Sequence, residues 1–365
     1  MIKKITLLSL LCITTVSYAN CRLIDHVTEQ FIANNHLTGA AIALVRGKHI
    51  TYCNYGYSDL EHHHKVTQNT LFDIASITKT VTATIAAIAY LDGKYDLYKP
   101  ITHYVPALTN PYYNKVTGIH LLTHTANIPL NFPVTTTESD LMRSLNALPF
   151  STMTQPGVFY VYSNPGIALV GIALQHVYHH SYQEIAQTLL LNKLDMHDTF
   201  TNVPTTFKGL VAEEFDQNNK PTPSYDAGAL VAAGGLKSTT HDLAKYLMYQ
   251  MNSSSDKTLN KALALTHDNY YCVANHRYQE LAWQYRPEQD LTVQHFNDKE
   301  STIKKAITTQ CKLTDGFFEK TGSTSYIIYS RTHKVGMVIL LNKSLVGDRV
   351  VLGRTIITIL ESSKS

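Results

Sequence analysis

The stretch F-D-I-A-S-I-T-K-T-V-T-A, residues 72 to 83, carries a serine three positions before a lysine at the start of an apolar run. On a helix, positions i and i+3 share a face, so the Ser76 hydroxyl and the Lys79 amine can meet there. Serine is a poor nucleophile at neutral pH and needs a neighbouring base. The spacing alone fits such a pair, but it equally fits a helix cap beside a solvated lysine.

The same spacing occurs twice more in the chain, at Ser254 with Lys257 and at Ser301 with Lys304. The stretches N-S-S-S-D-K and D-K-E-S-T-I-K-K around them are polar and typical of loops or exposed helix starts. Serine is a preferred residue at a helix start, so a cap beside a surface lysine explains both pairs. Ser76 differs because an apolar run follows it, and the positive end of a helix dipole there would favour negative charge on its oxygen.

Two further short motifs favour Ser76 over the other serines. The stretch Y-S-N at 162–164 precedes an apolar helical stretch, so a loop would present it at a helix entrance. The stretch K-T-G at 320–322 ends a predicted strand, where glycine permits close approach of a substrate. Among the three Ser-x-x-Lys pairs, only the one at Ser76 precedes both motifs. Order and setting together predict Ser76 as a nucleophile and Lys79 as its base.

The pattern of apolar residues outside these motifs predicts a sheet, then helices, then a sheet again. The predicted elements are helices at 22–35 and 76–91, a hairpin around Gly47-Lys48, three strands between 316 and 343, and a helix at about 346–360. Such an order fits a helical domain of residues 76–225 inserted into an α/β domain formed by residues 20–75 with 226–365. The active site is expected in the cleft between the two domains.

The first nineteen residues predict export. Lys3 and Lys4 precede a short apolar stretch that ends in small residues, which indicates a signal peptide at 1–19 cleaved near Ala19. A lipid-modified Cys21 is the weaker alternative, because asparagine is a poor residue before such a cysteine. No later stretch is apolar enough to span a bilayer. We therefore expect a soluble mature chain, periplasmic or secreted, without stable membrane association.

Charge, cysteines and histidines exclude several function classes. The formal net charge is +3, so no basic field attracts nucleic acid.

Four cysteines remain after cleavage, namely Cys21, Cys53, Cys272 and Cys311. They allow up to two disulfides, with three connectivities that the sequence leaves open. The histidine runs at 62–64 and 179–180 have no partners at ligand spacing, so we expect no metal and no cofactor. Without any interface repeat, a monomer is expected.

The motifs make the chain resemble the serine β-lactamase and penicillin-binding protein superfamily. The second element, Y-S-N rather than Ser-Asp-Asn, is similar to that of class C β-lactamases and their carboxypeptidase and esterase relatives. The stretches L-L-T-H-T-A-N-I-P at 121–129 and A-G-G-L-K-S-T-T-H-D-L-A at 233–244 support the resemblance, which covers essentially the whole mature chain. It implies a β-lactamase/transpeptidase-like fold of the α/β (α+β) class, with an antiparallel sheet flanked by helices and an inserted all-helical domain. His120 and His124 would then serve in the core or as caps.

The resemblance also implies a role for each motif residue. Ser76 would become acylated, and Lys79 would take part in proton transfer. Tyr162 would act as the partner acid and base, while Asn164 would hold Lys79 and the substrate amide. Because Lys320 would lie near as well, the lysines would lower each other's pKa and favour a tyrosinate or a neutral lysine.

The third motif would form the far wall of the site. Lys320 and Thr321 would face the substrate carboxylate beside Gly322. The backbone N–H groups of Ser76 and Ser323 would form an oxyanion hole. The next strand follows at once after this motif, so the hairpin beside the site is expected to be shorter than in class C enzymes.

The leading hypothesis is therefore an exported serine hydrolase that opens β-lactam rings through an acyl-enzyme. A D-alanyl-D-alanine carboxypeptidase or small-ester hydrolase with the same residues is the alternative. A penicillin-binding sensor that acylates without turnover is the third hypothesis. In each case the partner is a small-molecule β-lactam or cell-wall peptide.

Overall fold

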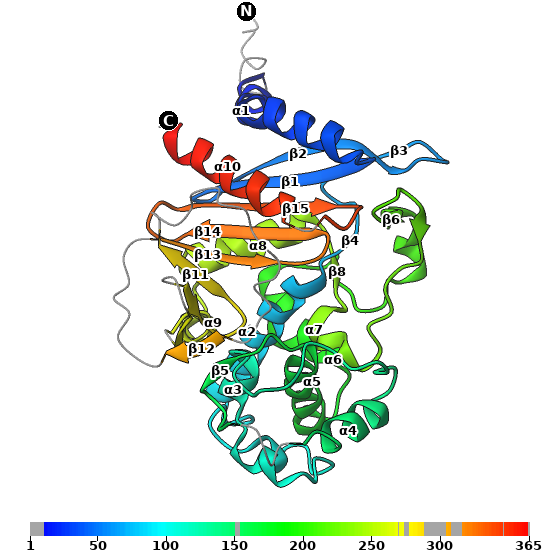
Figure 1. Cartoon of the computed structure of the whole chain (residues 1–365). Helices are drawn as coiled ribbons and strands as arrows, with labels where there is room; N and C mark the ends of the chain where they lie inside the picture. The colour runs from blue at the N-terminus through cyan, green and yellow to red at the C-terminus, as the bar shows by residue number, and fades with distance from the viewer. Residues whose placement is uncertain are drawn as a thin grey trace, which may run out of the picture.

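The computed structural model describes residues 11–149, 154–268, 270–273, 277–287, 304–307, 316–345 and 347–363 (Figure 1). The α-helices are α1 (Leu11–Asn35), α2 (Thr78–Leu91), α3 (Gly118–Leu122), α4 (Glu138–Asn146), α5 (Asn164–Tyr178), α6 (Tyr182–Ala186), α7 (Val231–Gly234), α8 (Thr240–Met251), α9 (Lys257–Leu265) and α10 (Asp348–Ser362). The longer strands are β1 (Gly39–Arg46), β2 (His49–Asp59), β11 (Gln284–Pro287), β12 (Lys304–Ile307), β13 (Gly316–Thr321), β14 (Ser325–Ser330) and β15 (Val335–Leu341). The short ones are β3 (His64–Lys65), β4 (Phe72–Asp73), β5 (Phe159–Tyr160), β6 (Glu214–Phe215), β7 (Pro221–Thr222), β8 (Lys237–Ser238), β9 (Tyr271–Val273) and β10 (Arg277–Gln279).

One large sheet joins the two ends of the chain. Its eleven strands follow the order β3-β2-β1-β15-β14-β13-β11-β10-β9-β12-β5, and the neighbours within it pair antiparallel. The early hairpin β1–β2 therefore lies directly beside the late strand β15, as the blue and orange arrows of Figure 1 show. Two separate two-stranded pairs, β4 with β8 and β6 with β7, lie outside this sheet.

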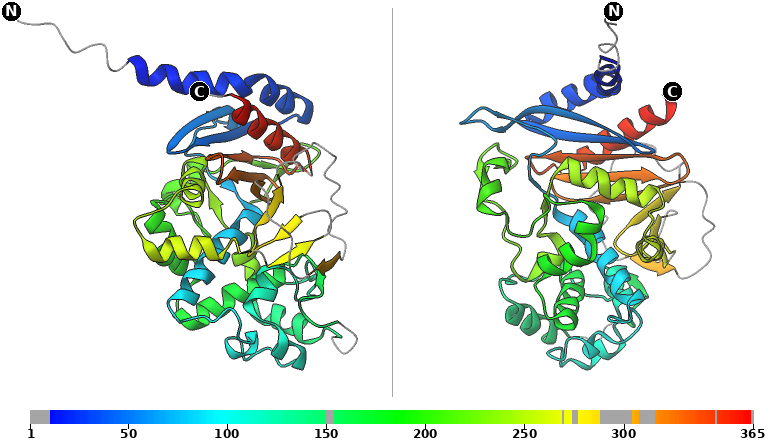
Figure 2. Two further views of the ribbon diagram at one scale, coloured as in Figure 1. Left: turned by 90° about the vertical axis from the view of Figure 1, so that its left-hand side faces the viewer. Right: turned by 180° about the vertical axis from the view of Figure 1, so that it is seen from behind.

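Helices cover both faces of the sheet. α1 and α10 lie on one face, and α8 with the remaining helices lies on the other (Figure 2). Strand β15 shows how the sequence serves both sides, because successive side chains of a strand point to opposite faces. Met337, Ile339 and Leu341 join the core under α1 and α10, whereas Val338 and Leu340 join the larger core that reaches α2, α5 and α8.

The predicted fold class is confirmed, since the sheet is antiparallel and helices flank it. The hairpin around Gly47 and the C-terminal helix are confirmed as β1–β2 and α10. The expected first helix lies within the longer α1, which begins at Leu11. Among the described residues no helix is both long and apolar enough to cross a membrane.

A disulfide between Cys21 and Cys53 ties α1 to β2, which resolves part of the pairing that the sequence left open. Cys272 is disulfide-bonded as well. Cys311 lies outside the described residues. The cross-link closes a loop of the chain over 32 positions and restricts the unfolded state accordingly.

Candidate active site

Ser76 lies in a short 3₁₀ turn, η1 (Ala75–Ile77), between β4 and α2. The residue before it, Ala75, has a φ of 44°, in the left-handed region that residues with a Cβ rarely adopt. The main chain is fixed there by a hydrogen bond of 3.0 Å from the Ile74 N–H to the Leu236 carbonyl. The serine is thus presented on a constrained turn immediately before a helix.

Lys79 contacts this serine from the first turn of α2. Its Nζ lies 3.0 Å from Ser76 Oγ and donates to the Ala233 carbonyl at 2.6 Å. The side chain is fully buried. Burial, reinforced by the positive charge of Lys320, holds the pKa of Lys79 well below its usual value. An amine that has lost its proton at this distance can accept one from the serine hydroxyl.

Tyr162 brings the two lysines together. The Nζ atoms of Lys79 and Lys320 lie 5.1 and 5.0 Å from the centroid of its ring. Burial lowers the pKa of Lys320 to about 7. Burial also raises the pKa of Tyr162, although its hydrogen bond with Ser76 acts in the opposite direction. Of the two expected protonation states, these shifts favour the neutral lysine over the tyrosinate, because desolvation disfavours the phenolate.

The K-T-G motif is held beside the turn that carries Ser76 by the residues that join β13 to β14. Ser325 Oγ donates to the Ile74 carbonyl at 2.8 Å, and Thr324 Oγ1 donates to the Asp73 carbonyl at 2.7 Å. A Cβ at Gly322 would lie 2.7 Å from that same Ile74 carbonyl oxygen, so this close approach requires glycine. Only three residues separate the two strands, which confirms that the next strand follows at once after the motif.

Thr321 ends β13, and Ser323 follows in the turn, where it lines a pocket of about 280 Å³ together with Ser76. Asn164 lines the same pocket as the first residue of α5. Its side-chain amide donates to Asn131 Oδ1 at 2.8 Å, while Lys79 contacts Ser76 and Ala233 instead. The structure therefore brings Asn164 to the pocket, but bonds it to a neighbouring loop rather than to the lysine.

His124 is a site neighbour whose position the sequence left undefined. Its ring lies 4.2 Å from the Tyr162 ring, and its Nδ1 accepts a hydrogen bond of 3.1 Å from the Ser163 N–H. Burial, together with the charges of Lys320 and Lys79, holds the pKa of His124 well below its usual value. The expected core use is confirmed for His124, and capping is confirmed for His120, which forms a capping box at the start of α3.

The Ser-x-x-Lys pair of Ser254 and Lys257 does not line this pocket. Asp256, not Ser254, caps α9, and the Ser254 Oγ accepts a hydrogen bond from the Asp256 N–H at 3.1 Å. The expected serine cap is thus wrong in detail, because a carboxylate next to the helix start takes that place. Ser301 lies outside the described residues.

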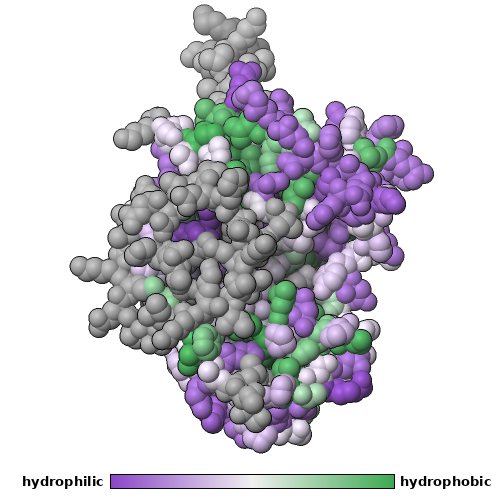
Figure 3. Space-filling view, viewed as in Figure 1, coloured by the Kyte–Doolittle hydropathy of each residue, from purple (hydrophilic) through white to green (hydrophobic). Residues whose placement is uncertain are grey.

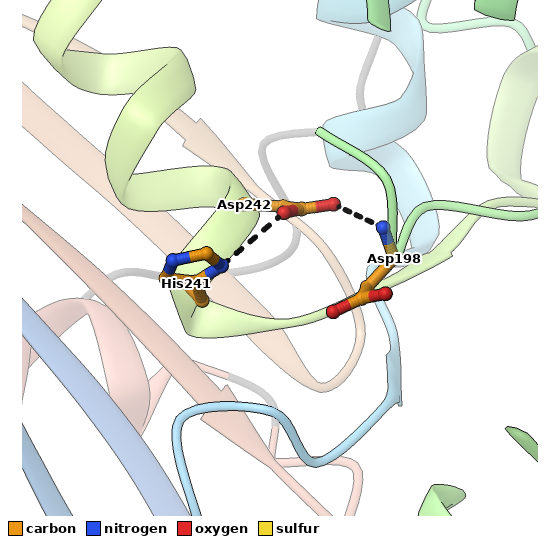
Figure 4. Close-up of side chains that lie close together, drawn as sticks. All are labelled: Asp198, His241 and Asp242. Carbon is orange, nitrogen blue, oxygen red and sulfur yellow. Dashed lines mark hydrogen bonds and ion pairs between the residues drawn. The ribbon is translucent and has the colours of Figure 1, made fainter. Parts of the chain in front are cut away.

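Asp198, His241 and Asp242 place their ligand-type atoms within 4.8 Å of one another at the start of α8 (Figure 4). Asp242 already accepts hydrogen bonds of 2.8 Å from the Asp198 N–H and from Thr199 Oγ1. Figure 4 shows the Asp198 carboxylate pointing away from that of Asp242. We assign these contacts to the anchoring of α8, because the Asp242 oxygens are used by the scaffold.

Three charged residues of the pocket region escaped the sequence analysis: Asp73, Glu214 and Lys237. Lys237 forms ion pairs with both carboxylates. Asp73 stands three positions before Ser76, so its proximity to the site could have been inferred. Glu214 comes from β6, and only the tertiary fold brings it there.

Comparisons with known proteins agree with this geometry. The model of the family described as Beta-lactamase matches residues 24–359. A protein of Pseudomonas fluorescens named Beta-lactamase is 31% identical over 338 residues, covering 88% of this chain and 93% of that protein. One of the same name from Escherichia coli K12 is 28% identical, covering 88% of each. A crystal structure described as a β-lactamase/D-alanine carboxypeptidase from Pseudomonas syringae superposes with a TM-score of 0.86 at 29% identity, covering 95% of this chain and all of the other.

Proposed function

The chain belongs to the beta-lactamase family, and we propose that it opens the β-lactam ring of antibiotics through a covalent acyl-enzyme on Ser76. One observation carries the proposal. Lys79 Nζ lies 3.0 Å from Ser76 Oγ at a place where burial and Lys320 hold the lysine pKa well below its usual value. A serine next to an uncharged amine is an activated nucleophile.

In the acylation step, Ser76 Oγ attacks the lactam carbonyl carbon while its proton passes to Lys79. The ring C–N bond then breaks, and the nitrogen takes the proton of the Tyr162 hydroxyl. Lys79 returns the proton that it accepted to the Tyr162 oxygen. In deacylation a water attacks the ester and transfers its proton by the same route to Ser76, which restores the enzyme. The raised pKa of Tyr162 fits a residue that begins the cycle as an acid.

The remaining motif residues would bind the substrate. Lys320 and Thr321 would face its carboxylate, and Asn164 would contact its amide from the pocket wall. The backbone N–H groups of Ser76 and Ser323 would stabilise the oxyanion, beside the close approach that Gly322 permits. The hydrogen bond from Asn164 to Asn131 supports a substrate-binding role rather than one in holding Lys79.

We further propose that the enzyme is of class C and is exported by residues 1–19 as a monomer, without a metal. The Y-S-N stretch, read with the signal-like N-terminus, supports this assignment. The division into a helical domain of 76–225 and an α/β domain of 20–75 with 226–365 belongs to the same proposal. It is supported by the position of Ser76 between β4 and α2.

A D-alanyl-D-alanine carboxypeptidase is the second candidate. The structure from Pseudomonas syringae carries both activities in its description. A peptide that ends in D-alanyl-D-alanine also offers a carbonyl next to a carboxylate. It would acylate Ser76 in the same way, with Lys79 as the base and Lys320 binding the carboxylate.

The test is turnover of a chromogenic cephalosporin by the mature protein, beside a Ser76→Ala variant and with intact-mass detection of adducts. Multiple turnovers that the variant loses are the expected result. A stable adduct on Ser76 without turnover would instead favour a penicillin-binding peptidase or sensor. The absence of both turnover and adduct would overturn the proposal. Ser254→Ala is the matched control, because it removes the serine of another Ser-x-x-Lys pair and should leave turnover unchanged.

A further inference from the structure

The pocket that holds Ser76 has an acidic wall. Asp73 on β4 and Glu214 on β6 both line it, together with the ring of Tyr225. Lys237 is the cation that pairs with these carboxylates, through an ion pair with Asp73 and a longer contact of 3.7 Å with Glu214. Two carboxylates against one ammonium leave the wall with an excess of negative charge when all three groups are ionised.

Asp73 is not fully satisfied by this arrangement. Its side chain is 10% exposed, and Oδ1 takes the contact with Lys237. Oδ2 has no hydrogen-bond partner among the residues that the structure describes. A buried carboxylate oxygen without a donor is costly, so the wall has unused capacity to accept a hydrogen bond.

The Glu214 carboxylate is also only weakly compensated, since its contact with Lys237 is long. Its side chain is 18% exposed, and burial raises its pKa to about 7. Burial also lowers the pKa of Lys237 to about 8, so this ammonium compensates Glu214 incompletely, and a further cation beside the carboxylate would favour its ionised form. Tyr225, 55% exposed, adds an aromatic face at the same pocket, and such faces attract ammonium groups.

The reacting end of the site has the opposite character. Lys79 and Lys320 both lie over the Tyr162 ring. A substrate with a carboxylate at one end and an ammonium on its acyl side chain would match both ends. The surface around β6, at the upper right of Figure 3, is mostly hydrophilic, which suits a charged group near this wall.

We propose that Asp73, Glu214 and Tyr225 form a subsite for a primary ammonium group on the acyl side chain of the substrate. This inference rests on the proposed function and specifies its substrate class. The ammonium would donate to Glu214 while it lies against the Tyr225 ring, and the enclosed Asp73 carboxylate would attract it through its negative charge. Two sources offer the same chemistry: an aminopenicillin, or a cell-wall peptide with a free side-chain amine.

The test compares substrates that differ only in that amine. Benzylpenicillin and ampicillin differ by one α-amino group. N-acetylated Lys-D-Ala-D-Ala peptides with a free or an acetylated side-chain amine form the second pair. For each pair the ratio of kcat/KM, amine-bearing over amine-free, is measured with the wild type and with Glu214→Gln. We expect the ratio to fall about tenfold in the variant, since one charge-assisted hydrogen bond is lost.

Glu213→Gln is the matched control. It removes the same charge from the adjacent position, which precedes β6 and does not line the pocket, and it should leave the ratio unchanged. Asp73→Asn should lower the ratio as well, and turnover of benzylpenicillin shows that each variant is folded. A fall in the penicillin pair or the peptide pair supports the subsite and identifies its source. Turnover with the same ratio in all variants would overturn the subsite alone, whereas no turnover or adduct with any substrate would overturn the proposed function.

Discussion

Two neighbouring residues of β13, Glu319 and Lys320, are both buried and charged, but their surroundings differ completely. Glu319 faces α10, where it pairs with Arg286 and Arg354 and accepts a hydrogen bond from the Tyr326 hydroxyl at 2.6 Å. Lys320 faces the active site, where it lies with Lys79 over the Tyr162 ring. Successive side chains of a strand point to opposite faces, so one strand serves both environments.

Glu319 and Lys320 differ in whether an opposite charge compensates their burial. Burial alone would raise the pKa of Glu319, but the two arginines hold it at about 2, so its charge is compensated. Burial lowers the pKa of Lys320 to about 7 and that of Lys79 further below its usual value, with no carboxylate against either among the described ion pairs. Groups whose pKa is shifted by uncompensated burial are candidates for proton transfer. The paired charges on the face of β13 toward α10 stabilise the fold. The unpaired lysines on the face toward Tyr162 cost stability, and their shifted pKa values suit proton transfer.

The largest effect should come from removing the base on the reactive face. Lys79→Gln keeps a polar side chain, one bond shorter, that cannot accept the proton of Ser76, so kcat/KM should fall by about 10⁴-fold. Steady-state turnover of a chromogenic cephalosporin measures it. Lys257→Gln, the same change in the pair at 254 and 257, is the control and should change kcat/KM less than twofold. Unchanged acylation of Lys79→Gln would remove this lysine from the mechanism.

On the scaffold face, Glu319→Gln should lower the free energy of unfolding by about 3–5 kcal/mol, because two buried arginines lose their counter-charge. Urea denaturation followed by fluorescence measures it, with the exposed Glu138→Gln as control. Because the folded pKa of about 2 lies below the unfolded 4.5, the wild type should lose this stability as pH falls from about 4.5 to 2. The variant should lack that dependence, and an equal slope in both proteins would contradict the comparison.

The contact between Ser76 and Lys79 could be predicted from the sequence. The charge pairing of Glu319, on the face of β13 toward α10, could not. Ser76 and Lys79 stand in one short motif whose spacing allows their contact, and its place before the two later motifs favoured this pair. Glu319 meets Arg286 and Arg354 over separations of 33 and 35 residues, and no local pattern marks such a pairing. The side-chain partner of Asn164 and the contact between His124 and Tyr162 were missed for the same reason, since each depends on how separate loops pack.

Neutralising the second lysine should have a smaller effect on stability and the opposite sign. Lys320→Met removes a buried charge that has no carboxylate partner among the described residues, so the free energy of unfolding at pH 6 should rise by about 1–2 kcal/mol. Wild-type Lys320 binds fewer protons folded than unfolded between about pH 7 and 10.5, so this advantage should shrink as pH rises through that window.

Activity offers an independent readout of the same variant. Loss of the positive neighbour should raise the pKa of Lys79 and move the acidic limb of the kcat/KM profile to higher pH. A profile that keeps its position would show that Lys320 does not tune Lys79. Lys334→Met, on the exposed turn between β14 and β15, is the control and should leave the limb where it is.

The smallest net effect should follow from replacing the whole compensated network at once. With Glu319→Leu, Arg286→Met, Arg354→Met and Tyr326→Phe together, no member is left unpaired, and apolar side chains of similar length fill the space. Such replacements are often neutral, so the free energy of unfolding should stay within about 1 kcal/mol of the wild type, although Glu319→Gln alone costs several. Urea denaturation of the two variants side by side measures this contrast. If the quadruple variant were as unstable as Glu319→Gln, the network would act through its specific geometry. If it matches the wild type, compensation of charge is what distinguishes this face of β13 from the face toward Ser76.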